Sequence, residues 1–134
     1  MARQLSFPVS YYFKMTETGI EIPFALELNG KRVDANAKVD PGSKYCLFRR
    51  ELGEDLGIDV LSGTKTMLST LTGTFSAYGH WVTLHTLKLE FDSFVLFHSE
   101  YEVSRNLLGR VGWLNNTHFA LTMDDEMIHL KSLQ

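Results

Sequence analysis

Cysteine is nearly absent from this chain of 134 residues, in which Cys46 is the only one. A single cysteine excludes an internal disulfide and agrees with a reducing compartment, and we expect Cys46 to be a small buried residue. Long apolar runs are absent as well, and residues 1–5 lead into an aromatic segment without the apolar stretch of a signal peptide. We therefore expect neither a membrane span nor a membrane partner, and we predict a cytoplasmic protein.

Clustered positive charge is also lacking, because the net charge is -3 and no basic run is longer than Arg49-Arg50. This argues against a nucleic-acid partner. The five histidines do not show metal-ligand spacing, and His80 and His85 fall on opposite faces of one expected strand. No Ser lies in a Gly-x-Ser-x-Gly elbow, so a serine hydrolase has no support. We expect no metal and no cofactor.

The chain contains the ordinary material of one globular domain. Apolar residues make up 44% of it and charged residues 22%, and no repeat or low-complexity segment interrupts it. A chain of this length buries one core. We therefore predict a single domain over residues 1–134.

Most of the pattern is β. Residues 20–28 alternate apolar and other side chains with a period of two, and Asn29-Gly30 is a strong signal for a tight hairpin turn. The returning strand is expected at 32–39 and delivers Asp40 at its end. Further strands are expected at 7–13, 64–71, 75–89, 94–98, 119–123 and 127–133, with a polar loop at 99–105. Helical spacing predicts a helix over 48–56 stopped by Gly57, and a second short helix follows Gly109 within 106–114.

Three motifs stand out in this order of elements. Asp40-Pro41-Gly42-Ser43 follows a buried strand, Thr72-Gly73-Thr74 forms a compact polar tip between two strands, and Leu107-Leu108-Gly109 ends another strand. Asp-Pro-Gly-Ser alone is also a good turn sequence, with Pro second and Gly third. The motifs carry information because of their order and separation.

In that order the motifs resemble the retropepsin-like aspartic peptidase family over roughly residues 20–133. The resemblance implies a mainly β retropepsin-like acid protease fold: a closed or partly closed β-barrel with one or two short helices and a flap hairpin. It also implies roles for the motif residues. Asp40 is the expected catalytic acid, and the others are the catalytic-loop residues Pro41, Gly42 and Ser43, the flap and substrate-binding residues Leu71, Thr72, Gly73 and Thr74, and the residues packed beside the loop, Leu107, Leu108 and Gly109.

The sequence holds only one such loop, whereas the chemistry uses two carboxylates that share a proton. The resemblance therefore implies a symmetric homodimer in which two copies of Asp40 activate a water that hydrolyses a bond of a peptide or protein substrate. It further implies that Ser43 hydrogen-bonds Asp40 and that Gly42 allows close approach of the backbone. The terminal strands at 7–13 and 127–133 are the expected interface.

Pro41 departs from the family pattern, which has Thr or Ser between the Asp and the Gly. Proline supplies neither a hydroxyl nor a backbone N–H to the contact between the two loops. This leaves a second reading, a catalytically impaired retropepsin-like module that binds peptide or mediates dimerisation. A third reading is a monomeric β-barrel that binds a small molecule.

Overall fold

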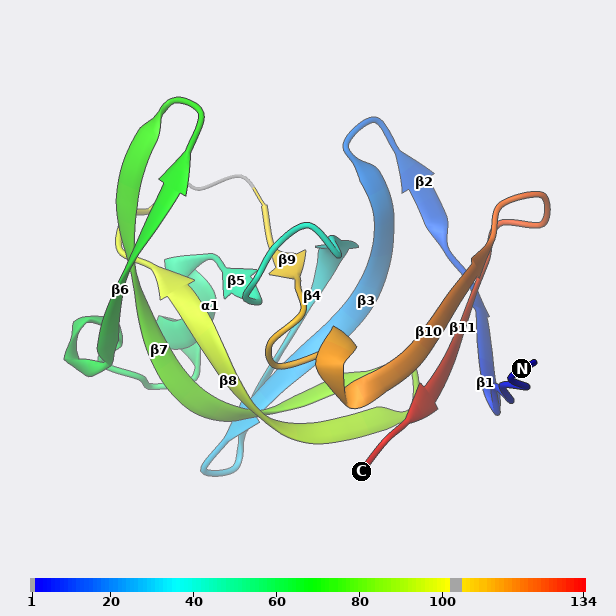
Figure 1. Cartoon of the computed structure of the whole chain (residues 1–134). Coiled ribbons are helices and arrows are strands. Elements are labelled where there is room, and N and C mark those ends of the chain that lie inside the picture. Colours follow the sequence, from blue (N-terminus) through cyan, green and yellow to red (C-terminus); the bar gives the residue numbers. More distant parts are fainter. Residues whose placement is uncertain (1, 102–104) are drawn as a thin grey trace.

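The structure, a computed structural model, describes residues 2–101 and 105–134 (Figure 1). Part of the loop expected at 99–105 thus lies outside the described residues. The chain is mainly β, as predicted. The strands are β1 (Val9–Tyr12), β2 (Lys14–Thr16), β3 (Gly19–Leu28), β4 (Lys31–Val39), β5 (Leu47–Phe48), β6 (Thr64–Thr70), β7 (Gly73–Thr86), β8 (Leu89–His98), β9 (Leu107–Leu108), β10 (Thr117–Thr122) and β11 (Met127–Ser132).

Eight strands form one sheet in the order β2-β3-β4-β9-β5-β8-β7-β6. A further pairing of β3 with β7, through Ala25–Glu27 and Thr83–His85, joins distant parts of this order. In sheet order, the six strands from β3 to β7 therefore form a ring. The ring is only partly closed, because β5 and β9 contribute only two residues each. The hairpins β2–β3 and β6–β7 extend from this ring toward the same side of the molecule (Figure 1).

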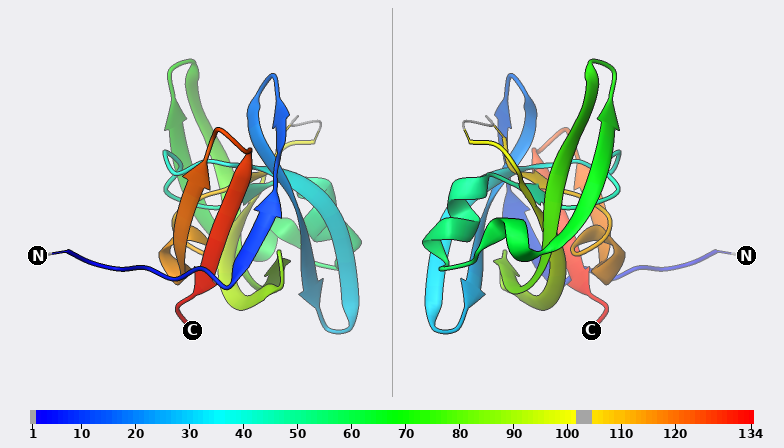
Figure 2. Two further views of the ribbon diagram at one scale, coloured as in Figure 1. Left: turned by 90° about the vertical axis from the view of Figure 1, so that its right-hand side faces the viewer. Right: turned by 90° about the vertical axis from the view of Figure 1, so that its left-hand side faces the viewer.

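The remaining strands form a second sheet in the order β1-β11-β10. All its pairings are antiparallel, and β11 is hydrogen-bonded on both sides, to β1 and to β10. Figure 2 shows this sheet face-on at one side of the molecule, with the segment before β1 running past β10.

Residue types explain the turn of the β3–β4 hairpin but not the turn of the β7–β8 hairpin. Asn29 and Gly30 adopt φ values of 50° and 81°, as a two-residue turn of positive φ requires. We expected one strand over 75–89, but β7 ends at Thr86 and a second tight turn follows at Leu87 and Lys88, with φ values of 48° and 70°. This correction has a physical reason: neither residue favours positive φ, so packing of the paired strands imposes the turn.

The helical segments are shorter than the sequence pattern predicts. The helix expected at 48–56 is α1 (Arg50–Asp55), because Phe48 belongs to β5 and is fully buried. Gly57 follows with φ 80° and ends the helix as expected. After Gly109 the chain forms only a 3-10 turn, η2 (Leu114–Asn116), and another, η1 (Val60–Ser62), precedes β6. No helix in the described ranges is both long and apolar enough to cross a membrane.

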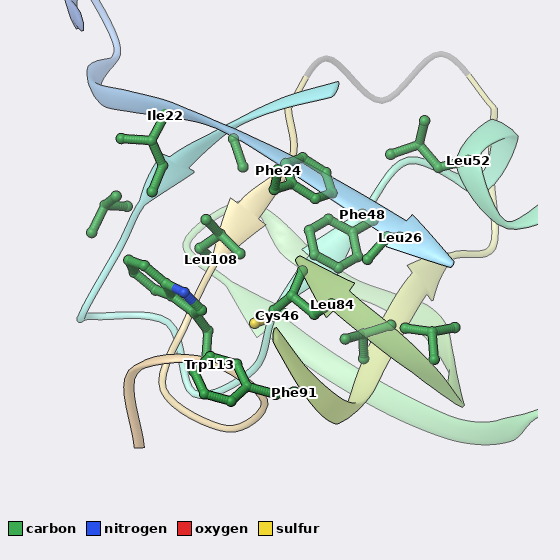
Figure 3. Close-up of a cluster of buried hydrophobic side chains, with 14 of the residues drawn as sticks. Ile22, Phe24, Leu26, Cys46, Phe48, Leu52, Leu84, Phe91, Leu108 and Trp113 are labelled. Carbon is green, nitrogen blue, oxygen red and sulfur yellow. The ribbon is translucent and has the colours of Figure 1, made fainter. Parts of the chain in front are cut away.

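One large apolar core fills the ring (Figure 3). Phe24 stacks on Phe48 with ring centroids 4.8 Å apart, and Trp113 is fully buried in the same core. Each such side chain contributes about 1.5–3 kcal/mol through burial. Leu108 belongs to the same core, and its burial holds the start of the segment from Leu108 to Val111 in place.

Candidate active site

Asp40 lies where strand β4 leaves the core. Ala37 and Val39 are buried, and Asp40 itself is half-buried. A turn follows at once, in which the Ser43 N–H donates to the Asp40 carbonyl oxygen at 3.1 Å and the Gly42 N–H donates to Asp40 Oδ1 at 3.0 Å. Pro41 is exposed at the second position of this turn, where no N–H is needed. The turn therefore fixes one carboxylate oxygen without any help from residue 41.

The segment from Leu107 to Val111 runs parallel to this turn and supports it. Val39 pairs with Leu108, and the Asp40 N–H donates to the Leu108 carbonyl at 3.0 Å. Farther on, the Arg110 N–H donates to the Ser43 carbonyl at 3.0 Å, and the Val111 N–H donates to the Lys44 carbonyl at 2.8 Å. Asp40 thus sits on a backbone that is hydrogen-bonded on both sides of its turn.

Gly109 is the point of closest approach between the two segments. A Cβ placed there would lie 2.2 Å from the Tyr45 carbonyl oxygen and 2.8 Å from that of Ser43, so only glycine fits. The Gly109 N–H donates to the Cys46 Sγ at 3.4 Å. Cys46 is fully buried, as expected, and burial raises the pKa of its thiol to about 12, with the Gly109 hydrogen bond opposing. This thiol is a packed structural group rather than a nucleophile.

The Ser43 side chain differs from its expected role. Its hydroxyl donates to the Tyr45 carbonyl oxygen at 2.7 Å, while only its N–H reaches Asp40, at the backbone oxygen. The hydroxyl is held by its own turn because Tyr45 O lies two residues away, within easy reach of a short side chain. Ser43 therefore stabilises the loop rather than the Asp40 carboxylate.

The expected flap is the β6–β7 hairpin, and its turn residues are Leu71 and Thr72. The sequence predicts the tip at residues 72–74, but Gly73 is already paired with Thr70, which makes the loop two residues long. The Thr70 hydroxyl donates to the Gly73 carbonyl at 3.0 Å and accepts the Thr72 N–H at 3.3 Å. Leu71 is fully exposed, and Thr74 is the second residue of β7.

The β2–β3 hairpin ends in the same way. Thr16 bonds Gly19 and Thr18 with the geometry that Thr70 uses at the flap tip. Both hairpins extend toward the side on which the connection from β4 to β5 lies (Figure 1). The Asp40 loop therefore has a projecting hairpin on either side.

Sequence reasoning missed an apolar patch between the Asp40 loop and the flap. Leu47, Ala77 and Leu96 are its buried centre, and the partly buried residues packed on it are Tyr45, Leu68, Phe75, Phe94 and Leu107. The apolar residues of the patch occupy alternate positions of β7 and β8. The sequence does not predict the pairing of these strands, because it gives no sign of the turn at Leu87 and Lys88. The patch joins the loop to the root of the flap.

A family model described as aspartyl protease matches residues 24–110, which include the Asp40 turn and the β6–β7 flap but not the tip of the β2–β3 hairpin. The chain belongs to the aspartyl protease family. The matched range covers well over half of the sequence. It contains both the Asp40 turn and the Leu107-Leu108-Gly109 segment that supports it.

A solved structure shares the fold of this chain. A crystal structure of a retropepsin-like aspartic protease from Rickettsia conorii superposes with a TM-score of 0.64 at 17% identity, covering 91% of this chain and 98% of that one. An EIAV protease complexed with the inhibitor HBY-793 covers 57% of this chain and 71% of its own, with 18% identity and a TM-score of 0.46. No curated protein sequence matches the chain. The retropepsin-like fold that the sequence predicted is therefore confirmed.

One group of side chains in this chain has the composition of a metal site. His85 Nε2 lies 2.8 Å from a Glu27 oxygen and 3.8 Å from a Glu90 oxygen, and the three ligand atoms lie within 4.8 Å of one another. They come from neighbouring strands at the end of β7–β8 opposite the flap tip. A cross-strand hydrogen bond between His85 and Glu27 accounts for the shortest of these contacts. Nothing in the described residues tests the expected absence of a metal, which stays a prediction.

Proposed function

We propose that this chain is an aspartic-type endopeptidase that works as a symmetric homodimer, in which two Asp40 residues activate one water. The observation that carries the proposal is the placement of Asp40: a half-buried carboxylate at the end of a core strand, in a turn hydrogen-bonded to Leu108 and Gly42. Two such turns facing each other across a twofold axis would bring two like carboxylates together.

The chemistry follows from that pairing. Two carboxylates about 3 Å apart do not both ionise readily, so the pair holds a single proton over a range of pH. The ionised member removes a proton from water as the water attacks the peptide carbonyl, and the protonated member donates its proton to the carbonyl oxygen. Collapse of the tetrahedral adduct then breaks the C–N bond: the carboxyl that took the water proton gives it to the amine nitrogen, and the other carboxylate accepts a hydroxyl proton of the adduct.

The surroundings suit an extended peptide or protein segment. The β6–β7 hairpin presents Leu71 to Thr74 above the Asp40 side of the molecule, and the apolar patch around Leu47 lies at its root. A peptide gripped in this way would be held largely by main-chain hydrogen bonds, while side-chain pockets decide preference. Flap closure would exclude water from the reacting bond.

Pro41 is compatible with the turn of one subunit, since it is exposed and no intrachain bond needs its N–H. Pro41 instead affects the contact between the Asp40 turns of the two subunits, to which a Thr would contribute a hydroxyl and an N–H. That loss supports the second candidate, a retropepsin-like module that binds peptide or dimerises without cleaving. Pro41→Thr should raise activity about five-fold for each bond of about 1 kcal/mol that it restores.

The deciding experiment measures cleavage of an unfolded protein at mildly acidic pH. Asp40→Asn should lower the rate by about 10²–10⁴-fold, because it removes both the base and the shared proton. Asp34→Asn is the matched control, because Asp34 is an exposed carboxylate on β4, the strand that leads into Asp40, and is paired with Arg32. A statine-type inhibitor should block the wild type.

Two outcomes would redirect the proposal. If Asp40→Asn cleaves as fast as the wild type, Asp40 is not the catalytic acid. If the wild type dimerises and binds the inhibitor but does not cleave, and Pro41→Thr does cleave, then the non-cleaving module is the correct reading.

A further inference from the structure

A cavity of about 480 Å³ lies beside the strand that leads into Asp40. The start of β3, the end of β4 and the backbone segments at 49 and 105–106 line it. Its volume falls within the range of roughly 300–1,000 Å³ in which proteins hold ligands. The lining includes three basic side chains and one carboxylate, namely Lys38, Arg49, Arg105 and Glu21. A cavity with this excess of positive charge attracts anions.

The cavity opens on the Asp40 side of β4. The Lys38 N–H donates to the Asn106 carbonyl at 2.9 Å, and the Asp40 N–H donates to the Leu108 carbonyl at 3.0 Å, so the backbone ladder continues as far as Asp40. Residues two apart in such a ladder share one face and lie about 7 Å from each other. Two residues of an extended peptide span the same distance. A peptide whose cleaved bond lies at Asp40 therefore brings neighbouring side chains within reach of Lys38.

The Lys38 side chain also leans along the strand toward Asp40. Lys38 pairs with Glu21, and continuing this register by two residues sets Gly19 opposite Asp40. The Lys38 Cε lies only 2.9 Å from the point that a Cβ on Gly19 would occupy. The lysine thus reaches past Glu21, with which it forms no ion pair within 4 Å, toward the row of Asp40.

A buried amide holds together the backbone segments that carry the basic residues. Asn106 is only 9% exposed, and its carbonyl accepts the Lys38 N–H. Its side-chain oxygen accepts the Arg49 N–H at 2.9 Å, and its Nδ2 donates to the Asn36 carbonyl at 3.1 Å. Arg105 directly precedes it in the chain. One hydrogen-bond network therefore sets the positions from which all three basic side chains extend.

We propose that this cavity is a substrate subsite that binds the side-chain carboxylate of a Glu or Asp close to the cleaved bond. The inference rests on the proposed function, and it narrows the substrate class to peptides with acidic residues beside that bond. Lys38 and Arg105 supply the charge, because no carboxylate in residues 2–101 and 105–134 lies within 4 Å of either. Arg49 is already paired with Glu51 at 3.4 Å. The Glu21 carboxylate opposes an acidic ligand and limits the preference.

Mapping of cleaved bonds is the first test. The wild type digests an unfolded protein at about pH 5, where a Glu side chain with its ordinary pKa of about 4.3 is mostly ionised. Mass spectrometry then locates the cleaved bonds. Asp and Glu should be enriched about three-fold or more within a few residues of these bonds, relative to their frequency in the digested protein. The absence of any enrichment would count against the subsite.

Two matched peptides isolate the contribution of the carboxylate. Both come from one mapped site, have blocked ends and differ only by Glu or Gln at the enriched position. The wild-type kcat/KM should be about ten-fold higher for the Glu peptide. Lys38→Met keeps the aliphatic stem but removes the charge, so this ratio should fall to about two-fold or less. Lys31→Met is the matched control, because Lys31 is an exposed lysine at the other end of β4, and it should keep the wild-type ratio.

A gain of preference gives a result that a folding defect does not produce. Glu21→Gln removes the one carboxylate among the lining residues and should raise the ratio by about three-fold above the wild type, whereas Arg105→Met should lower it. A substitution that only weakens the fold changes kcat/KM for both peptides alike. Ratios that stay at the wild-type value in Lys38→Met, Arg105→Met and Glu21→Gln would overturn the inference.

A binding measurement separates this inference from the proposed function. A labelled octapeptide with an apolar centre flanked by Glu, and its Gln counterpart, are titrated with the Asp40→Asn protein and followed by fluorescence anisotropy. Tighter binding of the Glu peptide supports the subsite even if cleavage does not depend on Asp40, in which case only the proposed function falls. If cleavage depends on Asp40 but both peptides bind and react equally, the proposed function stands and the subsite is wrong. A chain that binds and cleaves neither peptide removes both.

Discussion

Gly109→Ala tests whether the close approach of two backbone segments holds the Asp40 loop in place. The added Cβ would lie 2.2 Å from the Tyr45 carbonyl oxygen, whereas ordinary contacts begin at 3.4 Å, so the segments must separate by roughly 1 Å. Such overpacking against backbone costs about 3 kcal/mol, the upper end of its usual range. Displacing a catalytic group by 1 Å costs about 10²-fold in rate.

Urea unfolding and cleavage of an unfolded protein at mildly acidic pH measure the two effects. Gly30→Ala is a suitable control, because nothing lies within 4 Å of its Cβ position and its φ of 81° adds only a backbone penalty of about 1–2 kcal/mol. We expect the control to lose stability while keeping its rate. The reasoning is refuted if Gly109→Ala unfolds within about 1 kcal/mol of the wild type and cleaves at a similar rate.

Two further predictions concern buried titratable groups. Because the pKa of the Cys46 thiol is about 12, only about 10⁻⁴ of it is thiolate at about pH 8. The folded protein should therefore resist alkylation at this pH, whereas the protein in denaturant should react fully. Rapid labelling of the native protein would contradict the burial of Cys46. Burial lowers the pKa of His98 below its usual 6.5, against the opposing charges of Glu100 and Glu51. The unfolded chain therefore binds the proton more readily, so stability is complete above pH 6.5 and is lost as pH falls toward the lower folded value. His98→Gln should lose less stability than the wild type between about pH 7.5 and about pH 5 in urea titrations, and equal losses would refute the assignment.

The parts of the fold that the sequence predicted correctly are those encoded by local chemistry. Asn29-Gly30 supplies positive φ, so the β3–β4 hairpin and the delivery of Asp40 at its end could be read from residue types. Gly57 likewise ended the helix. The order of motifs around Asp40 and Gly109 sufficed to identify the family, which the model match over 24–110 confirms.

The parts that were missed depend on contacts between distant residues. Leu87 and Lys88 carry no turn signal, and their positive φ arises from ten residue pairs of the β7–β8 ladder. Phe48 has helical spacing with Leu52, yet burial against Phe24 places it in a strand. The roles of Asp40 and the flap residues stay predictions, because neither the family match nor the shared fold tests the role of a single residue.

The pairing that closes the ring also connects the two projecting hairpins mechanically. One hairpin contains β3 and the other contains β7. These two strands pair with each other through Ala25–Glu27 of β3 and Thr83–His85 of β7. The hydrogen bond between His85 and Glu27 lies at this junction. The two hairpins therefore share one supporting junction, which fixes the base of each hairpin relative to the other.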